Sequence, residues 1–159
     1  MIVIGYQGIG KSTLAGRNNK FIDLESSNFR IDGKRTDDWY KPYCKVAEHL
    51  SQQGYIVFTS SHEVVREYLV DNSREIVVLV YPSIELEDAW IGKLEKRYEK
   101  SGLDKDYRAL MNAIDRFEDN IRELQGSCIE YKLELQNMNY DLEASLIHLK
   151  NELDGWANK

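Results

Sequence analysis

The chain has 159 residues, the length of one domain, and its 42% of hydrophobic residues suffice for a buried core. The longest apolar run, at 76–81, has six residues, whereas a membrane-spanning helix needs about 20. Because the first residues also lack the basic and apolar segments of a signal peptide, we expect a cytoplasmic protein without a membrane partner. The net charge of −6 argues against nucleic acid as a partner. Cys44 and Cys128 have no metal-ligand spacing, and we expect both to be reduced and buried.

A phosphate-binding motif directly follows the first apolar segment. It comprises Gly5, Tyr6, Gln7, Gly8, Ile9, Gly10, Lys11, Ser12 and Thr13, which match the pattern G-x-x-x-x-G-K-[ST]. In such a loop the glycines let successive backbone N–H groups point at phosphates, and the following helix adds its positive N-terminus. We expect Lys11 to reach the β- and γ-phosphates of a nucleotide and Ser12 to ligate Mg²⁺. An ordinary glycine turn is the alternative, which the preceding apolar strand disfavours.

The elements that follow alternate between helices and strands. The first helix is brief, because Gly16 and residues 18–19 are stop signals. Further along, the sequence predicts strands at 21–24, 55–59 and 75–81, a helix from a cap at 36–38 to about Gln53, and a short helix at 62–70. From Ile84 the chain is strongly helical for about forty residues, in two pieces separated by residues 101–102.

The second of these helices and the two elements after it complete the pattern. One apolar stripe of the helix is predicted to pack on the protein: Leu103, Tyr107, Leu110, Met111, Ile114, Phe117, Ile121 and Leu124. Residues 128–135 alternate between apolar and charged side chains, as in a strand at a sheet edge, and 142–153 form a closing amphipathic helix. Strands alternating with helices indicate an α/β protein with a doubly wound parallel sheet, which binds ligands at the carboxyl ends of its strands.

The N-terminal third, from the first strand through the phosphate loop to residues 21–25, resembles the small P-loop kinases of the nucleoside monophosphate kinase and shikimate kinase group. The order of elements is also similar, and small phage-encoded nucleotide kinases match the length. The resemblance implies a single P-loop kinase domain at 1–159 with the three-layer α/β/α fold of P-loop NTPases. It further implies a parallel five-stranded sheet in the order 2-3-1-4-5, a helical lid at about 92–125 between strands 4 and 5, ATP and Mg²⁺ as cofactors, and phosphoryl transfer to a small acceptor.

Two acids end the second predicted strand, where shikimate-kinase-like members carry Asp-x-Asp. The resemblance implies that Asp23 lies near Mg²⁺ and that Glu25 orients the acceptor. Residues two apart on a strand point to the same face, so both carboxylates can face one pocket; the alternative is that they cap the next loop or face solvent. The third strand ends in residues 58–62 without the aspartate of a Walker B motif, so Asp23 must take the metal role in an active kinase.

The segment after the second strand, where the family binds its acceptor, combines arginines with aromatic rings. Arg30 and Arg35 can grip a monophosphate and Trp39 can stack on a base, although packing of Trp39 and solvation of the charges explain the same pattern. Ser60 and His62 follow the third strand at the expected pocket mouth and can hydrogen-bond the acceptor. A lone histidine at such a place is more often a helix cap.

Basic side chains are concentrated where the family carries its lid. Residues 92–108 hold six basic and four acidic side chains in an otherwise acidic chain. Arg97 stands where the family's lid places an arginine on the transferring phosphate, which would stabilise charge on its equatorial oxygens. A salt-bridged helix surface is the alternative.

Three functions fit these patterns. The first hypothesis is an ATP- and Mg²⁺-dependent kinase of a (deoxy)nucleoside monophosphate, a monomer or homodimer with Lys11, Asp23, Glu25 and Arg97 as catalytic residues. The second is a kinase of a nucleobase in DNA or of a small metabolite. The third is a nucleotide-binding regulator that does little chemistry, because the third-strand aspartate is missing and the first helix is short.

Overall fold

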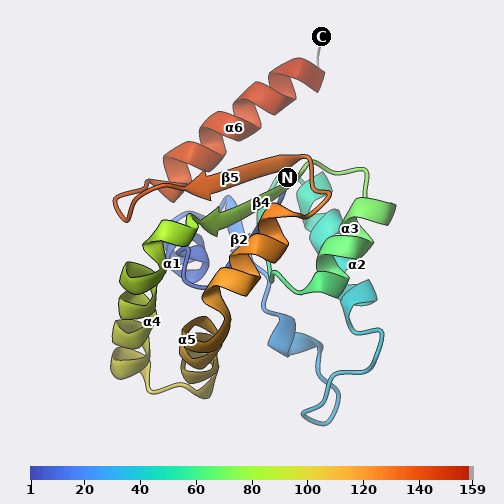
Figure 1. Cartoon of the computed structure of the whole chain (residues 1–159). Helices are drawn as coiled ribbons and strands as arrows, with labels where there is room; N and C mark the ends of the chain where they lie inside the picture. The colour runs from blue at the N-terminus through green and yellow to red at the C-terminus, as the bar shows by residue number, and fades with distance from the viewer. Residues whose placement is uncertain (158–159) are drawn as a thin grey trace.

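The computed structural model describes residues 1–157, in which helices enclose a central sheet (Figure 1). The strands are β1 (Ile2–Gly5), β2 (Phe21–Asp23), β3 (Ile56–Thr59), β4 (Val77–Pro82) and β5 (Tyr131–Leu135). The helices are α1 (Lys11–Arg17), α2 (Tyr40–Gln52), α3 (Glu63–Asn72), α4 (Glu87–Ser101), α5 (Asp104–Gln125) and α6 (Leu142–Ala157), with 3-10 turns η1 (Ser26–Phe29) and η2 (Ile84–Leu86). Among the described residues, no helix combines the length and apolar character that crossing a bilayer requires.

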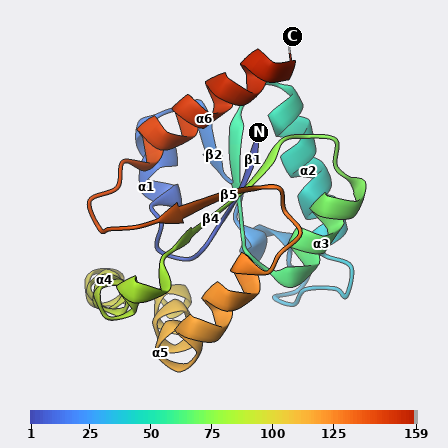
Figure 2. The same ribbon diagram turned by 45° about the horizontal axis from the view of Figure 1, so that its top comes forward.

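All strand pairs in the sheet are parallel, in the order β2-β3-β1-β4-β5. This confirms the predicted doubly wound sheet, its strand order, and the place of the last strand at an edge. The central strands β1 and β3 are buried throughout, as their continuous apolar sequences require when both faces are covered. Figure 2 shows α1 and α6 on one side of the sheet and α2 and α3 on the other, which gives the three layers.

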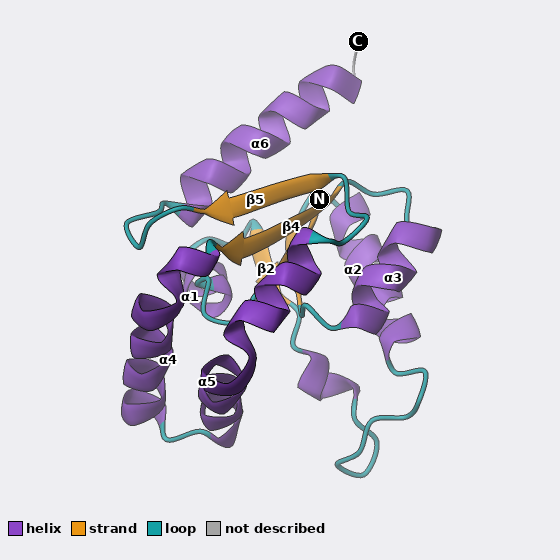
Figure 3. Ribbon diagram, viewed as in Figure 1, coloured by secondary structure: helices purple, strands orange, loops and turns teal. Residues whose placement is uncertain are grey.

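Parallel pairing brings the ends of separate strands to one edge of the sheet. Ile4 of β1 lies opposite Thr59 of β3, and Phe58 lies opposite Asp23 of β2. The segments that follow these strands therefore meet, although they are far apart in the sequence. Figure 3 shows one of them, the long loop between η1 and α2, extending away from the sheet.

Helices α4 and α5 form an antiparallel hairpin, in which Gly102 ends α4 in the left-handed conformation at φ 63°. The predicted apolar stripe of α5 is only partly correct. Its later members are buried, but Leu103, Tyr107 and Ile114 are 51%, 44% and 48% exposed. The prediction assumed a straight helix, whereas α5 has a non-helical residue at Arg116 (φ −140°, ψ 20°), and the half before this kink turns the face with Asp106 inward.

Two smaller predictions were also wrong. Residues 36–38 do not cap α2: Thr36 Oγ1 bonds to the Asp38 carboxylate, and the helix begins one turn later at Tyr40. Cys44 is buried, and burial raises the pKa of its thiol to about 12, but Cys128 is exposed in the turn before β5.

Candidate active site

The phosphate loop between β1 and α1 depends on two glycines in backbone conformations that other residues rarely adopt. Gly8 has φ +89° and Gly10 has φ +107°. Gly8 also passes so close to α4 that a Cβ would lie 2.9 Å from a Leu94 methyl carbon and 3.1 Å from Trp90 Nε1. A side chain at this position would therefore push the loop away from the helix.

Two aromatic side chains fix the direction of the loop's peptide groups. Trp90 Nε1 donates to the carbonyl of Gln7 at 2.9 Å, and the hydroxyl of Tyr140 donates to the carbonyl of Ile9 at 2.8 Å. Burial raises the pKa of Tyr140 to about 12, so its hydroxyl keeps the proton that it donates. Because the N–H of a trans peptide points away from its C=O, the amides of Gly8 and Gly10 face the opposite side, where a phosphate would bind.

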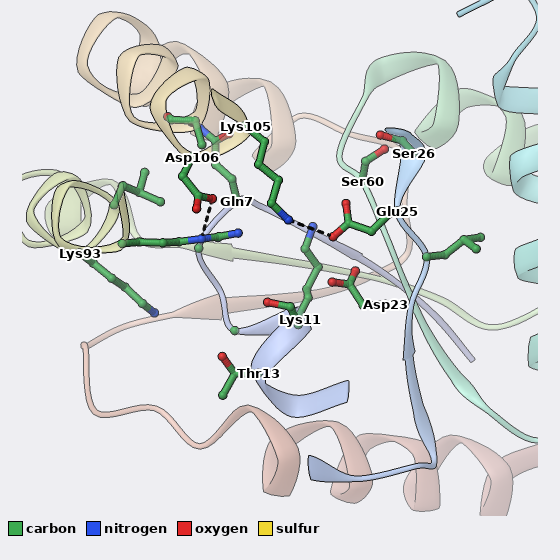
Figure 4. A pocket seen from close by; sticks show the side chains of 17 residues that line it. Gln7, Lys11, Thr13, Asp23, Glu25, Ser26, Ser60, Lys93, Lys105 and Asp106 are labelled. Atoms are coloured by element: carbon green, nitrogen blue, oxygen red, sulfur yellow. Dashed lines mark hydrogen bonds and ion pairs between the residues drawn. The ribbon is translucent and has the colours of Figure 1, made fainter. Parts of the chain in front are cut away.

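A cavity of about 370 Å³, here named the phosphate cavity, opens on that side of the loop. Figure 4 shows Lys11, Asp23, Glu25 and Lys105 converging in it from separate elements. Its lining consists of Gln7, Gly8, Gly10, Lys11, Ser12, Thr13, Asp23, Leu24, Glu25, Ser26, Ser60, Lys93, Leu94, Arg97, Lys105, Asp106 and Ala109. The predicted catalytic residues thus share one cavity with most of the phosphate loop.

The ionised groups in the phosphate cavity perturb one another. Lys11 Nζ donates to the Gly5 carbonyl at 3.1 Å, and burial lowers the pKa of Lys11, while the carboxylates of Asp23 and Glu25 act in the opposite direction. Burial raises the pKa of Asp23, and the positive charge of Lys11 counteracts this effect. Glu25 has a cation of its own, because Lys105 Nζ lies 3.6 Å from its carboxylate. An anionic ligand would therefore enter a cavity in which the acids are only partly neutralised.

Arg97 is held at the cavity wall by a buried acid. Its Nε lies 2.9 Å from a carboxylate oxygen of Asp106, which is 4% exposed and also accepts a hydrogen bond from the Ser101 hydroxyl. Figure 4 marks the ion pair that Asp106 makes. Because Asp106 faces Nε, the terminal nitrogens of the guanidinium are left for another anion.

Ser12 and Asp23 are the oxygen donors that fit Mg²⁺ in this cavity. Mg²⁺ is usually held by one or two protein oxygens together with substrate phosphates and water. Asp23 makes no ion pair within 4 Å among residues 1–157, so its carboxylate is available to such an ion. No group of three or more His, Cys, Asp or Glu side chains that could hold a metal ion occurs in the same residues.

A second cavity of about 320 Å³, here named the side chamber, lies on the other side of Lys11. It is lined by Gly5, Tyr6, Gln7, Lys11, Ser60, Ser61, His62, Arg66, Asn112, Asn120, Glu123 and Leu124. Ser60 and His62, predicted to meet the acceptor, both face this chamber and are hydrogen-bonded to each other at 2.7 Å. Burial, with the cations of Arg35 and Lys11, lowers the pKa of His62 to about 4, so the ring is neutral near pH 7.

Four predicted ligand-binding residues line neither cavity. Ile9 is buried, and only its carbonyl is engaged, by Tyr140. Trp39 is 8% exposed, and the guanidinium of Arg35 lies 4.5 Å from the centre of its ring, so this ring packs in the core. Arg35 also donates to Ser26 Oγ at 2.8 Å, while Arg30 is exposed near the tip of the loop.

Several residues at the two cavities were not singled out from the sequence. Lys93, Lys105 and Asp106 of the phosphate cavity belong to the charged segment that was noticed, but their direction depends on the helical hairpin. Nothing in the sequence separates Arg66, Asn112, Asn120 and Glu123 of the side chamber from ordinary surface residues.

Comparisons with known proteins add evidence on the fold. No protein-family model and no curated protein sequence matches the chain. Among solved structures, it is similar to the shikimate kinase of Bacteroides thetaiotaomicron, with a TM-score of 0.51 and 16% identity over 96% of this chain and 97% of that one. The chain has the fold of shikimate kinase. The chain is also similar to an uncharacterized protein from Eubacterium ventriosum, with a TM-score of 0.47 and 14% identity over 97% of each chain. At these identities the likeness extends to the fold alone.

Proposed function

We propose that the protein is a kinase that transfers the γ-phosphoryl group of ATP, in the presence of Mg²⁺, to a (deoxy)nucleoside monophosphate. The observation that carries this proposal is the meeting of the phosphate loop, Lys11, Asp23 and Glu25 in one cavity. A P-loop without neighbouring carboxylates could bind phosphate, but it would lack the groups that position a metal ion and an acceptor.

Each of these residues has a distinct task in the proposed reaction. The loop amides and Lys11 bind the phosphates, and Arg97 stabilises negative charge on the transferred group. Mg²⁺, held by Ser12 and Asp23, would neutralise charge on the β- and γ-phosphates. Glu25, whose carboxylate lies 3.6 Å from Lys105 Nζ, would align the acceptor.

The charge around the loop after β2 favours an acceptor that carries a phosphate. Burial lowers the pKa of Arg35, and the cations of Arg30 and Arg108 act in the same direction, so their positive charge extends to Arg35. Arg35 also contacts Ser26 of the phosphate cavity and His62 of the side chamber. A monophosphate entering between the cavities would meet this positive edge.

An ADP-release assay across nucleoside monophosphates and small hydroxy acids tests the proposal. We expect turnover with a nucleoside monophosphate, and a loss of about 100-fold or more in Lys11→Met and Asp23→Asn, because each variant removes a charge that acts on the phosphates or the metal. Lys20→Met is the matched control, since Lys20 directly precedes β2 at the opposite end of the strand from Asp23.

Calorimetry of ATP binding, run beside the same assay, distinguishes the kinase from the main alternative, a nucleotide-binding regulator. The third strand ends at Thr59 without an acid, as a nucleotide-binding regulator would allow. Tight binding of ATP without acceptor-stimulated turnover, unchanged in Asp23→Asn, would refute the kinase and favour the regulator. Turnover with hydroxy acids alone would refute the nucleotide acceptor.

A further inference from the structure

The side chamber adjoins the phosphate cavity. It shares Gln7, Lys11 and Ser60 with the phosphate cavity, so a molecule can extend from one space into the other past the Lys11 side chain. Figure 4 shows Lys11 and Ser60 among the side chains that line the phosphate cavity. The chemistry of the chamber wall therefore bears on which acceptor can bind.

The charged residues of the chamber, apart from Lys11, are already neutralised by one another. Arg66 is 8% exposed, its Nε donates to the Ser61 carbonyl at 3.0 Å, and its terminal nitrogen lies 2.5 Å from the Glu123 carboxylate. His62 is neutral near pH 7, because its pKa is lowered to about 4 by burial and by Arg35 and Lys11. Lys11 Nζ donates to the Gly5 carbonyl and is attracted by the carboxylates of Asp23 and Glu25, so its charge is partly balanced from the phosphate cavity.

The uncharged part of the wall is held together across the kink of α5. Asn112 and Asn120 are eight residues apart, a rise of about 12 Å in a straight helix, yet Asn120 Nδ2 donates to Asn112 Oδ1 at 2.7 Å. The same oxygen accepts from Gln7 Nε2 at 3.2 Å, and Gln7 also donates to the carbonyl of Ala109. These bonds engage the oxygen of Asn112 and leave its amide N–H groups for an occupant.

We propose that the side chamber selects an uncharged, hydrogen-bonding group of the acceptor, such as a nucleobase, and rejects a carboxylate, with the Arg66–Glu123 pair and Asn112 as the specificity determinants. This inference rests on the proposed function, because it describes the acceptor of that reaction. A ring nitrogen or carbonyl of a base can accept from the Asn112 amide, the kind of pairing that asparagine makes with base edges. A carboxylate would give up part of its hydration at the chamber wall without gaining an unpaired cation, which is unfavourable.

Two small molecules of nearly equal shape test this selectivity directly. Nicotinamide and nicotinate differ in having an amide or a carboxylate, and their binding is followed by NMR at the side-chain amides of Asn112 and Asn120. We expect nicotinamide to shift these resonances and to bind at least about tenfold more tightly than nicotinate. Equal or tighter binding of nicotinate at these residues, or no shift with either molecule, would overturn the proposal.

The Glu123→Gln variant sharpens the test by leaving Arg66 without its partner. We expect the preference to shift toward nicotinate, because the chamber then contains an unpaired cation. Glu118→Gln is the matched control on the same helix, where Glu118 pairs with exposed Arg122 outside the chamber. The double variant Arg66→Gln/Glu123→Gln removes both charges, guards against misfolding of the single variant, and should keep the preference for nicotinamide. An unchanged preference in Glu123→Gln with intact thermal unfolding would contradict the assignment.

Repeating the titrations in Lys11→Met separates this inference from the proposed function. Lys11→Met removes the one cation of the chamber that Glu123 does not pair, and the titrations are done without ATP. The preference for nicotinamide should therefore persist in this variant. If the kinase assay fails while the preference holds, the proposed reaction is wrong and the chamber's selectivity stands. If turnover occurs while nicotinate binds as well as nicotinamide, only the selectivity is refuted.

Discussion

The two cavities that adjoin Lys11 use charge in opposite ways. The phosphate cavity has Lys11, Lys93, Arg97 and Lys105 on its wall, together with Asp23, Glu25 and Asp106. The side chamber of similar size has one buried arginine, which is paired with Glu123, a neutral histidine and two asparagines. The phosphate cavity therefore suits a ligand of high charge, and the side chamber an uncharged group.

This difference matches the demands of phosphoryl transfer. Charge moves during the transfer, and fixed cations beside the phosphates stabilise it without having to reorganise. An unreactive group is recognised through neutral hydrogen bonds. A wrong ligand that cannot form them leaves polar groups of the site unpaired, which weakens its binding. A substitution that weakens one cavity should therefore leave binding in the other nearly unchanged.

After Lys11→Met and Asp23→Asn, the next largest effect is expected from Asp106→Asn, which changes only the phosphate cavity. Asp106 is the buried partner of Arg97, so its loss frees the guanidinium from one defined position. We expect kcat to fall about tenfold or more, with much smaller changes in the KM for ATP and in nicotinamide binding to the chamber. Asp104→Asn, which removes an exposed partner of Arg108, is the matched control. An equal loss in both variants would show that Asp106 does not act through Arg97.

The sequence was sufficient for the fold and for the core of the phosphate cavity because their signals are local. The motif at 5–13 and the spacing of Asp23 and Glu25 each depend on residues within one short segment, and the parallel sheet then brings these segments together. The alternation of apolar strands with helices predicts a parallel sheet, and the resemblance to small P-loop kinases implies its strand order.

The side chamber could not be predicted in the same way. Asn112 and Asn120 meet only because α5 bends at Arg116, and no proline or glycine in α5 indicates this bend in the sequence. Arg66 is buried, and the acid that pairs with it, Glu123, is 57 residues away in the sequence. The sequence allows the Trp39 ring either to stack on a base or to pack in the core. The ring is covered by the Arg35 guanidinium and buried among core residues, which favours packing.

A smaller effect is expected from Tyr140→Phe, which alters the phosphate loop without changing the charge of either cavity. The variant removes the hydroxyl that bonds to the Ile9 carbonyl and accepts from Lys93 Nζ at 2.6 Å. One such hydrogen bond contributes about 1 kcal/mol, so calorimetry should show ATP affinity reduced about fivefold. Tyr131→Phe on β5 is the control. Equal affinity in the two variants would mean that the loop amides do not depend on Tyr140.

The smallest effect is expected from the side chamber's histidine and concerns the pH dependence of stability. The pKa of His62 is lowered to about 4 in the folded protein, while an unfolded chain takes up the proton near pH 6.5. As pH falls from about 6.5 toward 4, the unfolded state is therefore stabilised by protonation and the folded state is not, so stability decreases. In thermal unfolding, His62→Gln should lose less Tm over this interval than the wild type, whereas His49→Gln, with its histidine exposed on α2, should follow the wild type. A wild-type slope in His62→Gln would show that the pKa of His62 is not lowered in the folded protein, and the side chamber would then gain a positive charge below about pH 6.5.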